Sequence, residues 1–318
     1  MVDVSIVVCT YNRAESLRET LETLVSQNRS GMNYEIIVVD NNSKDHTKKI
    51  AQSFNGQLKY VFEPKQGLSY ARNTGIKQAT GQIIAFTDDD VIVDQNWVSN
   101  VFRCFQETQA LMVAGKIERL WTCQRPAWLT EEISGPLIVQ DLGPLRKRWD
   151  SGTRHTVGAN MAFRRIVFEK FGFFQEELGR RGNQLIGGED REIFRRIFES
   201  GGRIFYEPKA VVHHKVEKER LSKSFMQRWF RDVGATLGHQ IPWRWHYSLT
   251  IAPLWLWKNW IIACFKLINI FLKPVSNEAE RFACEIWFQH YSAMMRERFL
   301  HWIPLGVGKT FCVFDQKN

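Results

Sequence analysis

The chain has 318 residues, of which 44% are hydrophobic and 24% charged, so it can bury a full α/β core and still carry a smaller second region. This composition excludes a disordered or fibrous protein, and the formal net charge of +9 indicates an anionic partner: a phosphorylated substrate, an anionic membrane surface or nucleic acid. The six cysteines form no CxxC pair and no secretory signal is visible at the start, which favours a reducing, cytoplasmic compartment.

The first hundred residues alternate short β-branched runs with helical patterns, as βαβ units do when they build a parallel sheet. Strands are expected at 5–9, 35–40, 58–62 and 82–87. Between them, helical periodicity or capping residues predict helices around 17–25, 45–50 and 68–79. The pattern therefore predicts an α/β fold with a Rossmann-like, mostly parallel central sheet flanked by helices.

Polar clusters follow the first, second and fourth of these strands: Thr10, Asn12 and Arg13; Asp40, Asn41 and Asn42; and Asp88, Asp89 and Asp90. In open parallel sheets, ligands bind outside the carboxyl ends of the strands. We therefore expect the three clusters to face one crevice.

The next segments are less regular. The pattern predicts a helix over 91–105, loops over the site from 124 to 150, a helix over 189–200 and an extended segment over 203–213. We expect an N-terminal α/β domain over residues 1–216 and a helical, basic C-terminal region over 217–318.

The C-terminal region concentrates positive charge and tryptophan. From Lys215 onward lie 15 of the 43 Lys and Arg, only 8 of the 34 Asp and Glu, and 8 of the 12 Trp. A basic, Trp-rich segment is typical of a protein that rests on an anionic bilayer. The apolar run 248–272 contains Pro253, Lys258, Asn259 and Lys266, which favours an interfacial helix over a membrane span, with a helix packed on the catalytic domain as the alternative.

The strongest chemical feature is the TDDD segment at 87–90, directly after an apolar strand. Three adjacent carboxylates repel one another unless a cation or hydrogen-bond donors lie nearby. Mg²⁺ or Mn²⁺ binds such oxygens and fills its other positions with substrate phosphate. In isolation an Asp triplet is more often a solvated turn, but its place at a strand end favours a metal site.

Two further motifs carry candidate reactive groups. The GGED segment at 187–190 opens a helix, and its carboxylate can remove a proton from an acceptor hydroxyl, although acidic residues at a helix start also simply complement the dipole. The pair His213 and His214 ends an extended segment and can supply an imidazole ligand to the same metal, with His214 preferred.

The segments VSIVVCTYNR, EIIVVDNNSKD, GLSYARNTGIKQATGQIIAFTDDD and GGEDREIFRRI together resemble the family 2 glycosyltransferases of the GT-A fold, over about residues 4–216. The resemblance implies a Mn²⁺- or Mg²⁺-dependent enzyme that inverts the anomeric centre. It implies Asp190 as the base with Glu189 as its companion, Asn160 beside the donor sugar and acceptor, and Asp88 and Asp90 as the outer residues of a DxD motif at the ribose and the metal. With the histidine pair, the candidate metal ligands are Asp88, Asp90, His214 and His213, and Gly188 is expected to leave space for the donor sugar and acceptor. The nucleotide-binding residues that the resemblance implies are Thr10, Asn12, Arg13, Asp40, Asn42, Gly67, Arg72, Asp88 and Asp89.

The implied activity is transfer of a sugar from a nucleotide diphosphate donor to a glycan or lipid-linked acceptor at the inner face of the cell membrane, in the synthesis of cell-surface polysaccharide. UDP or dTDP is favoured because a carboxylate at Asp40 suits the imide of uracil or thymine. The main alternative is a non-catalytic nucleotide-sugar-binding scaffold at the membrane. Nucleotidyl transfer would need a Gly-rich basic phosphate loop after the first strand, and no nucleic-acid recognition motif is readable, so no nucleic-acid partner is expected.

Overall fold

The computed structural model describes residues 2–150, 156–182, 187–240, 252–272 and 277–302. The chain forms two compact units, one made of Met1–Pro126 with Ser134–Ser222 and the other of Ala127–Ile133 with Lys223–Asn318. The first unit extends beyond the expected boundary at residue 216, because the 3-10 turn η2 (Lys218–Leu221) returns Arg220 to the side chain of Asp90.

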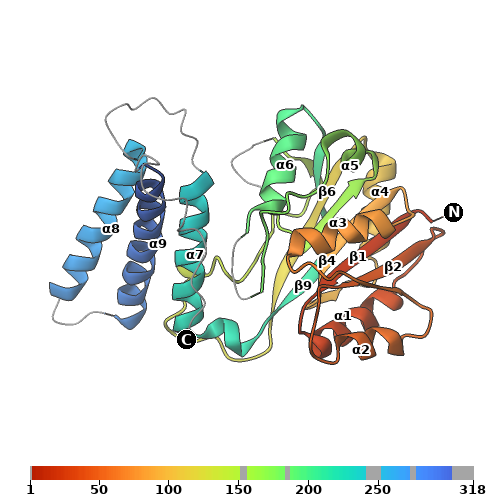
Figure 1. The fold of residues 1–318 in the computed structure, drawn as a ribbon, viewed down its shortest axis with the longest axis horizontal. Helices are drawn as coiled ribbons and strands as arrows, with labels where there is room; N and C mark the ends of the chain where they lie inside the picture. Colours follow the sequence, from red (N-terminus) through yellow and green to blue (C-terminus); the bar gives the residue numbers. More distant parts are fainter. Residues whose placement is uncertain (1, 151–155, 183–186, 241–251, 273–276, 303–318) are drawn as a thin grey trace. The chain divides into compact units, whose positions relative to one another are not determined.

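The first unit alternates strands and helices along its N-terminal half (Figure 1). Its strands are β1 (Val4–Thr10), β2 (Tyr34–Asp40), β3 (Lys59–Phe62), β4 (Ile83–Asp88), β5 (Val91–Val93), β6 (Met112–Trp121), β7 (Lys147–Arg148), β8 (Asn160–Arg164) and β9 (Ile204–Val216). Its helices are α1 (Ala14–Val25), α2 (Thr47–Ser53), α3 (Leu68–Gln78), α4 (Trp97–Glu107), α5 (Ile166–Phe171) and α6 (Glu189–Glu199). The expected first four strands and the helices between them are present.

The strands described in this unit form one sheet in the order β3-β2-β1-β4-β8-β6-β9-β5, with β7 beside β9. The pairs β2–β3, β1–β2, β1–β4 and β6–β9 are parallel, whereas β8 is antiparallel to both β4 and β6. The α/β fold with helices flanking a central sheet is confirmed. The parallel arrangement is continuous only from β3 to β4, and the rest of the sheet is mixed.

Helices cover both faces of this sheet because its central strands are apolar on both sides. Val4, Ile6 and Val8 pack in one core cluster with α1, α2 and α4, while Val7 packs in another with α3, α5 and α6. Figure 1 shows α1 and α2 on one side of the strands and α3 on the other. Each fully buried aliphatic side chain of this kind stabilises the fold by about 1.5–3 kcal/mol.

The close packing of α3 on the sheet requires glycine. A Cβ added at Gly75 would lie 2.4 Å from Cγ1 of Val7 on β1. Because no side chain fits at that distance, the GIK segment of α3 lets the helix approach the strand directly. The N-terminus of α3 lies near the carboxyl edge of the sheet, since the N–H of Gly67 donates to Asn41, which directly follows β2.

One expected helix is partly wrong. Residues 91–93 form strand β5, antiparallel to β9, and α4 begins only at Trp97. The VIV run is β-branched, and residues of that kind pack well in strands. Of the expected loops over 124–150, residues 127–133 belong to the second unit, and β7 joins the sheet.

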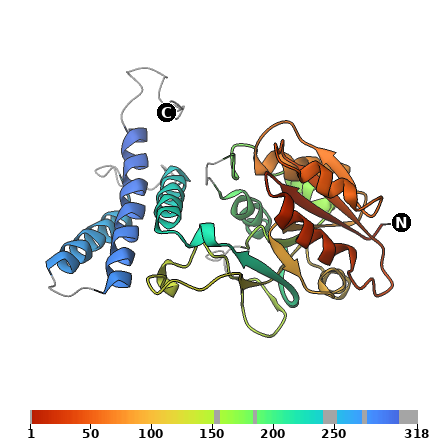
Figure 2. The same ribbon diagram turned by 90° about the horizontal axis from the view of Figure 1, so that it is seen from below.

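The second unit is helical, with α7 (Lys223–Gln240), α8 (Leu254–Leu272), α9 (Glu278–Trp302) and the short 3-10 turn η1 (Glu131–Ile133). In Figures 1 and 2, α8 and α9 lie side by side, and they share a small core that includes Leu256 and Met294. Part of the expected apolar run, residues 248–251, lies outside the described residues; the described remainder is mainly α8.

Candidate active site

The three polar clusters meet at the carboxyl edge of the parallel strands. β1 lies between β2 and β4 in the sheet, so their ends are neighbours. Nη1 of Arg13 lies 3.2 Å from Oδ1 of Asp89 and 2.5 Å from Oδ2 of Asp90, which joins the first and third clusters. The main-chain N–H of Lys44 donates to Oδ1 of Asn12 at 2.7 Å, which joins the loop after β1 to the loop after β2. The expectation of one shared edge is confirmed by these contacts.

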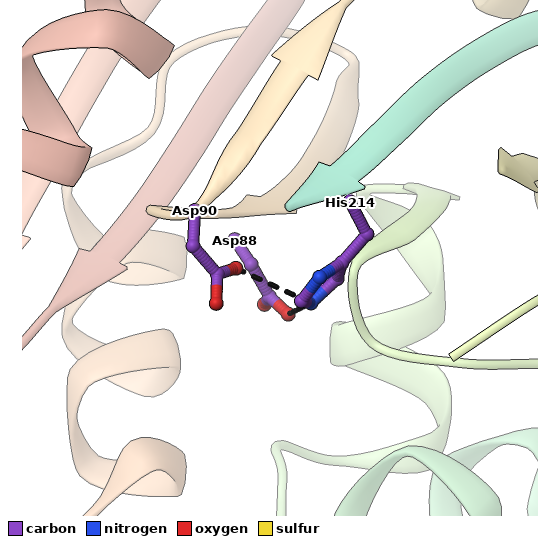
Figure 3. Close-up of side chains that lie close together, drawn as sticks. All are labelled: Asp88, Asp90 and His214. Carbon is purple, nitrogen blue, oxygen red and sulfur yellow. Dashed lines mark ion pairs between the residues drawn. The ribbon is translucent and has the colours of Figure 1, made fainter. Parts of the chain in front are cut away.

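The pairing of β5 with β9 places a histidine beside this edge. Val91 is opposite His214 in the antiparallel register, and His214 lies next to the carboxylates that precede β5. Its Nε2 is 3.3 Å from Oδ1 of Asp90 and 3.8 Å from Oδ2 of Asp88. Figure 3 shows the three side chains converging.

The neighbouring histidine does not join them. Consecutive residues of a strand point to opposite faces, so His213 is directed away from Asp88 and Asp90. Its Nδ1 lies 3.4 Å from Oε2 of Glu118 on β6 instead. The expectation that His213 is a metal ligand is therefore not supported, whereas His214 lies where a ligand is needed.

The set Asp88, Asp90 and His214 fits a divalent cation, since one ligand atom from each lies within 4.8 Å of the others. Nδ1 of His214 lies 3.1 Å from the carbonyl oxygen of Lys215. A carbonyl can only accept, so this contact favours a proton on Nδ1 and leaves the Nε2 lone pair facing the carboxylates. Among the described residues, neither Nε2 of His214 nor Oδ1 of Asp90 has a hydrogen-bond partner, although both are buried. A cation between them would satisfy both.

Two arginines hold the other oxygen of Asp90. Oδ2 accepts hydrogen bonds from Arg13 and from Arg220 on η2. Burial opposes ionisation of Asp90, but His214 when it is protonated, together with Arg220 and Arg13, keeps the pKa of Asp90 well below the usual range. Asp90 is therefore a carboxylate with one oxygen tied to guanidinium groups and one directed at His214.

Asp89 has a different environment from its neighbours. Burial raises the pKa of Asp89 to about 6, although Arg13 opposes the rise. Its side chain contacts Arg13 and lies outside the Asp88, Asp90 and His214 set. In the TDDD segment, the first and third carboxylates are thus the candidate ligands.

Several residues that were expected to bind the nucleotide also make hydrogen bonds within the protein. Asp40 is buried, and its oxygens accept from the Ser43 N–H at 2.9 Å and from the Tyr60 hydroxyl at 2.8 Å. Asn42 has a positive φ of 66° and receives a hydrogen bond from Nζ of Lys44 at 2.9 Å. Thr10 ends β1 opposite Asp40 in the parallel register.

Gly67 precedes α3 with a φ of 148°, a conformation that side chains rarely adopt. Its N–H donates to Oδ1 of Asn41 at 2.7 Å, and this contact links the start of α3 to the end of β2. Gly67 therefore lies at the edge where the nucleotide residues were expected.

The GGED segment places two carboxylates at the start of α6. Oε1 of Glu189 is 2.7 Å from Nη1 of Arg72, and both side chains are buried. Oδ2 of Asp190 accepts from the N–H of Gly158 at 3.0 Å, and Oδ1 from the N–H of Arg191 at 2.7 Å. Burial raises the pKa of Asp190, although Arg72 and these hydrogen bonds oppose it.

The surroundings assign the two carboxylates different tasks. Glu189 is tied to Arg72, whose guanidinium also lies 5.3 Å from the ring centroid of Phe174. Arg72 is buried and paired with Glu189, and its expected place near the base and phosphates stays a prediction. Gly188 adopts a left-handed φ of 100° directly before α6, so it starts the helix that presents Asp190.

Asn160 is a correction. Its Nδ2 donates to the carbonyls of Lys116 at 2.8 Å and Ala210 at 2.9 Å, and its Oδ1 accepts from Nε1 of Trp97 at 2.9 Å. With the side chain 1% exposed and its amide occupied on both sides, Asn160 joins β6, β8, β9 and α4. The expected contact with a sugar does not exist in this geometry.

Replacing Asn160 by alanine should therefore lower stability. Two buried hydrogen bonds and one partly buried hydrogen bond would be lost, and each buried group left unpaired costs about 1–3 kcal/mol. We expect the free energy of unfolding in urea to fall by roughly 3 kcal/mol or more, and to change little in the control Asn33→Ala, which is exposed. Unchanged stability with a higher donor KM would restore the sugar contact.

Sequence reasoning missed Arg220 and Arg180. Arg220 lies 130 positions after Asp90, so no local spacing could have linked them. Burial lowers the pKa of Arg180, as do the nearby Arg220 and Arg13, while Asp88 opposes this. Arg13 and Arg220 thus contact the carboxylates at this edge, and Arg180 interacts with them electrostatically, an arrangement suited to a phosphate-bearing ligand with a cation.

Comparisons with known proteins agree with this arrangement. Residues 5–172 match the family model described as "Glycosyl transferase family 2". The chain is 29% identical over 223 residues to the glucosyl-dolichyl phosphate glucuronosyltransferase of Haloferax volcanii, covering 68% of this chain and 70% of that protein. It is 28% identical over 277 residues to the succinoglycan biosynthesis protein ExoM of Rhizobium meliloti, covering 82% and 85%.

Two solved structures share the fold. A mannosyltransferase from Pyrobaculum calidifontis in complex with GDP-Man and Mn²⁺ superposes with a TM-score of 0.53 at 17% identity, covering 93% of this chain and 73% of that one. GalNAc-T7 with UDP, GalNAc and Mn²⁺ superposes with a TM-score of 0.54 at 18% identity. This chain is covered over 76% of its length and spans 51% of the GalNAc-T7 chain. At these identities the likeness is one of fold.

Proposed function

Because the chain belongs to glycosyl transferase family 2 and is a glycosyltransferase, we propose that it transfers a sugar, with inversion, from a nucleoside diphosphate donor to a hydroxyl of a glycan or lipid-linked acceptor. The observation that carries this proposal is the set Asp88, Asp90 and His214, in which Asp90 and His214 are buried and one ligand atom of each has no hydrogen-bond partner among the described residues. Relatives named for a dolichyl phosphate glycan and for succinoglycan support an acceptor in polysaccharide or lipid-linked glycan synthesis.

Asp190 is the candidate base. Its carboxylate takes the proton of the acceptor hydroxyl while that oxygen attacks the anomeric carbon and the bond from this carbon to the diphosphate oxygen breaks. The N–H groups of Gly158 and Arg191 hold the carboxylate in place. Oε1 of Glu189 is held by Arg72 in a buried ion pair, which gives this carboxylate a structural task, although its Oε2 has no hydrogen-bond partner among the described residues.

The leaving diphosphate carries the charge that the site must stabilise. Arg13 and Arg220 contact Asp90, Arg180 is near enough to interact electrostatically with Asp88 and Asp90, and guanidinium groups bind phosphate oxygens well. Bound Mn²⁺ or Mg²⁺ would add Lewis-acid neutralisation of the same charge. Single displacement needs no covalent intermediate on the protein.

The nucleotide is proposed to be UDP or dTDP. Asp40 is the carboxylate that would accept a hydrogen bond from the base imide, since each of its oxygens retains a second lone pair beyond those used by Ser43 and Tyr60. Thr10, Asn12, Asn42 and Gly67 line the same edge and complete the proposed nucleotide pocket. We place the enzyme at the inner face of the cell membrane, where a lipid-linked acceptor is accessible.

Thermal unfolding with UDP, dTDP, GDP and CDP, each with Mn²⁺ or EDTA, tests the pocket. A ligand that binds only the native state at 100 times its Kd stabilises it by about 2.7 kcal/mol. We expect UDP or dTDP with Mn²⁺ to raise Tm, and EDTA to remove the shift. A protein that none of the nucleotides stabilises would contradict the donor assignment and favour a role without nucleotide-sugar turnover.

A further inference from the structure

Helix α8 presents an apolar surface that the described residues leave uncovered. The α8 face consists of Leu254, Trp255, Ile261, Ile262, Phe265, Ile268 and Leu272, each between 41% and 76% exposed. Soluble proteins expose single apolar side chains commonly, but a set of this size on one helix marks an interaction surface.

The burial pattern of α8 shows why this face is open. The buried residues Leu256, Ala263 and Ile270 recur every seven positions. Such spacing forms one narrow stripe along a helix, and Leu256 lies in the core shared with α9. Trp257, Trp260 and Phe271 also contact this core or α9, and the residues of the α8 face lie outside these contacts.

Charge identifies the partner. The only charged residues of α8 are Lys258 and Lys266, both exposed, and the helix contains no Asp or Glu. Lysine side chains can extend from an apolar surface to reach lipid phosphates, and Trp is favoured at the membrane interface. An apolar helix surface whose own charged residues are these two lysines complements an anionic bilayer surface.

The packing of α9 indicates that α8 lies in the interface instead of crossing the bilayer. Although α8 is long and apolar enough to span a membrane, the side chain of Arg281 on α9 lies 4.4 Å from the ring centroid of Phe271. Nε1 of Trp260 donates to Ser292 on α9 at 3.0 Å. A spanning α8 would bring the charged residues of α9 into the hydrocarbon, where charge is costly.

We propose that the α8 face binds the surface of an anionic bilayer, with the helix parallel to the membrane and its lysines at the phosphate level. This deepens the proposed function, on which it rests for the location of the acceptor. The surface would hold the enzyme where a lipid-linked glycan is presented.

Co-sedimentation of the full chain with vesicles of phosphatidylcholine, with and without phosphatidylglycerol, tests the proposal. Binding is expected to require the anionic lipid and to be reversed by high salt. The double variant Phe265→Glu with Ile268→Glu should lose about 100-fold or more in vesicle affinity. The conservative pair Lys258→Gln with Lys266→Gln should lose roughly tenfold, on anionic vesicles only.

The matched control is Leu145→Glu with Ile166→Glu, which adds the same charge at exposed apolar residues of the first unit. It should bind vesicles as the unaltered chain does. Vesicle binding that survives the glutamates on α8, or binding that resists alkaline carbonate as an inserted helix does, would overturn the proposal. The proposal would also be overturned if the unaltered chain formed an oligomer and did not bind vesicles, while the α8 variants were monomeric. That result would show that the α8 face binds a second copy of the chain.

The nucleotide-induced rise in Tm separates this proposal from the proposed function. All of these variants should retain the Mn²⁺-dependent shift of the unaltered chain, because the substitutions lie outside the metal and nucleotide residues. Loss of vesicle binding with an intact shift supports the α8 face. If nucleotide and Mn²⁺ do not raise the Tm of the unaltered chain, the donor assignment is contradicted. The vesicle-binding result then still tests the α8 face, because it does not depend on nucleotide binding.

Discussion

Mn²⁺-dependent nucleotide binding is expected to disappear in Asp90→Asn. Asparagine retains the size of the side chain and can still accept from Arg13 and Arg220, but it removes the negative charge directed at His214. A hard divalent cation depends on that charge, so affinity for Mn²⁺ should fall by at least about 100-fold. Titration calorimetry of Mn²⁺ in the presence of UDP measures the change directly.

Two histidine variants provide the comparison. His214→Ala should weaken Mn²⁺ binding clearly, while His213→Ala, the adjacent residue on β9, should not affect it because its side chain faces Glu118. Asp90→Asn also leaves Arg220 without its ion pair, and breaking a buried pair costs about 3–5 kcal/mol. Unfolding curves must therefore accompany the titration. A folded Asp90→Asn protein with normal metal-dependent binding would exclude the cluster as the metal site.

The second large effect is expected in Asp190→Asn, which should retain metal-dependent UDP binding and lose sugar transfer. General-base catalysis contributes about 10²–10⁴ in rate, so transfer should fall by that factor. Initial rates of sugar transfer and the nucleotide-induced rise in Tm separate the two properties. Glu199→Gln is the matched control, because this acid is exposed at the other end of α6.

Glu189→Gln distinguishes the base from its neighbour. It breaks the buried ion pair with Arg72, so its loss of activity should be accompanied by a lower Tm. Asp190→Asn should change Tm much less. If transfer persists in Asp190→Asn while a stable Glu189→Gln protein is inactive, the roles of the two carboxylates are exchanged.

The pH dependence of kcat/KM also tests Asp190 as the base. A base works only when deprotonated, and burial raises the pKa of Asp190 despite the opposing Arg72. The acid limb of kcat/KM should therefore lie at a higher pH than that of an ordinary aspartate, whose pKa is about 3.9. An acid limb at or below this value would argue against Asp190 as the base.

The sequence alone determined the N-terminal α/β layout and the edge at which its polar residues meet. Strands such as SIVVC are largely apolar, which indicates a sheet buried on both faces. Because parallel strands bring their carboxyl ends together, Arg13, Asp40 and Asp90 could be assigned to the carboxyl edge of the sheet before any contact was known. The TDDD segment likewise identified carboxylates that need a nearby cation, and the GGED segment identified a candidate base at the start of a helix.

Only the tertiary structure decided which side chains meet at the carboxyl edge of the sheet. His214 and His213 are adjacent and chemically identical, and the β5–β9 register alone selects the first for the cluster. Arg220 reaches Asp90 from a turn distant in the chain, while Asn160 is consumed by hydrogen bonds to three elements. Local patterns specify periodicity and charge, but facing direction and long-range pairing arise only when the strands align.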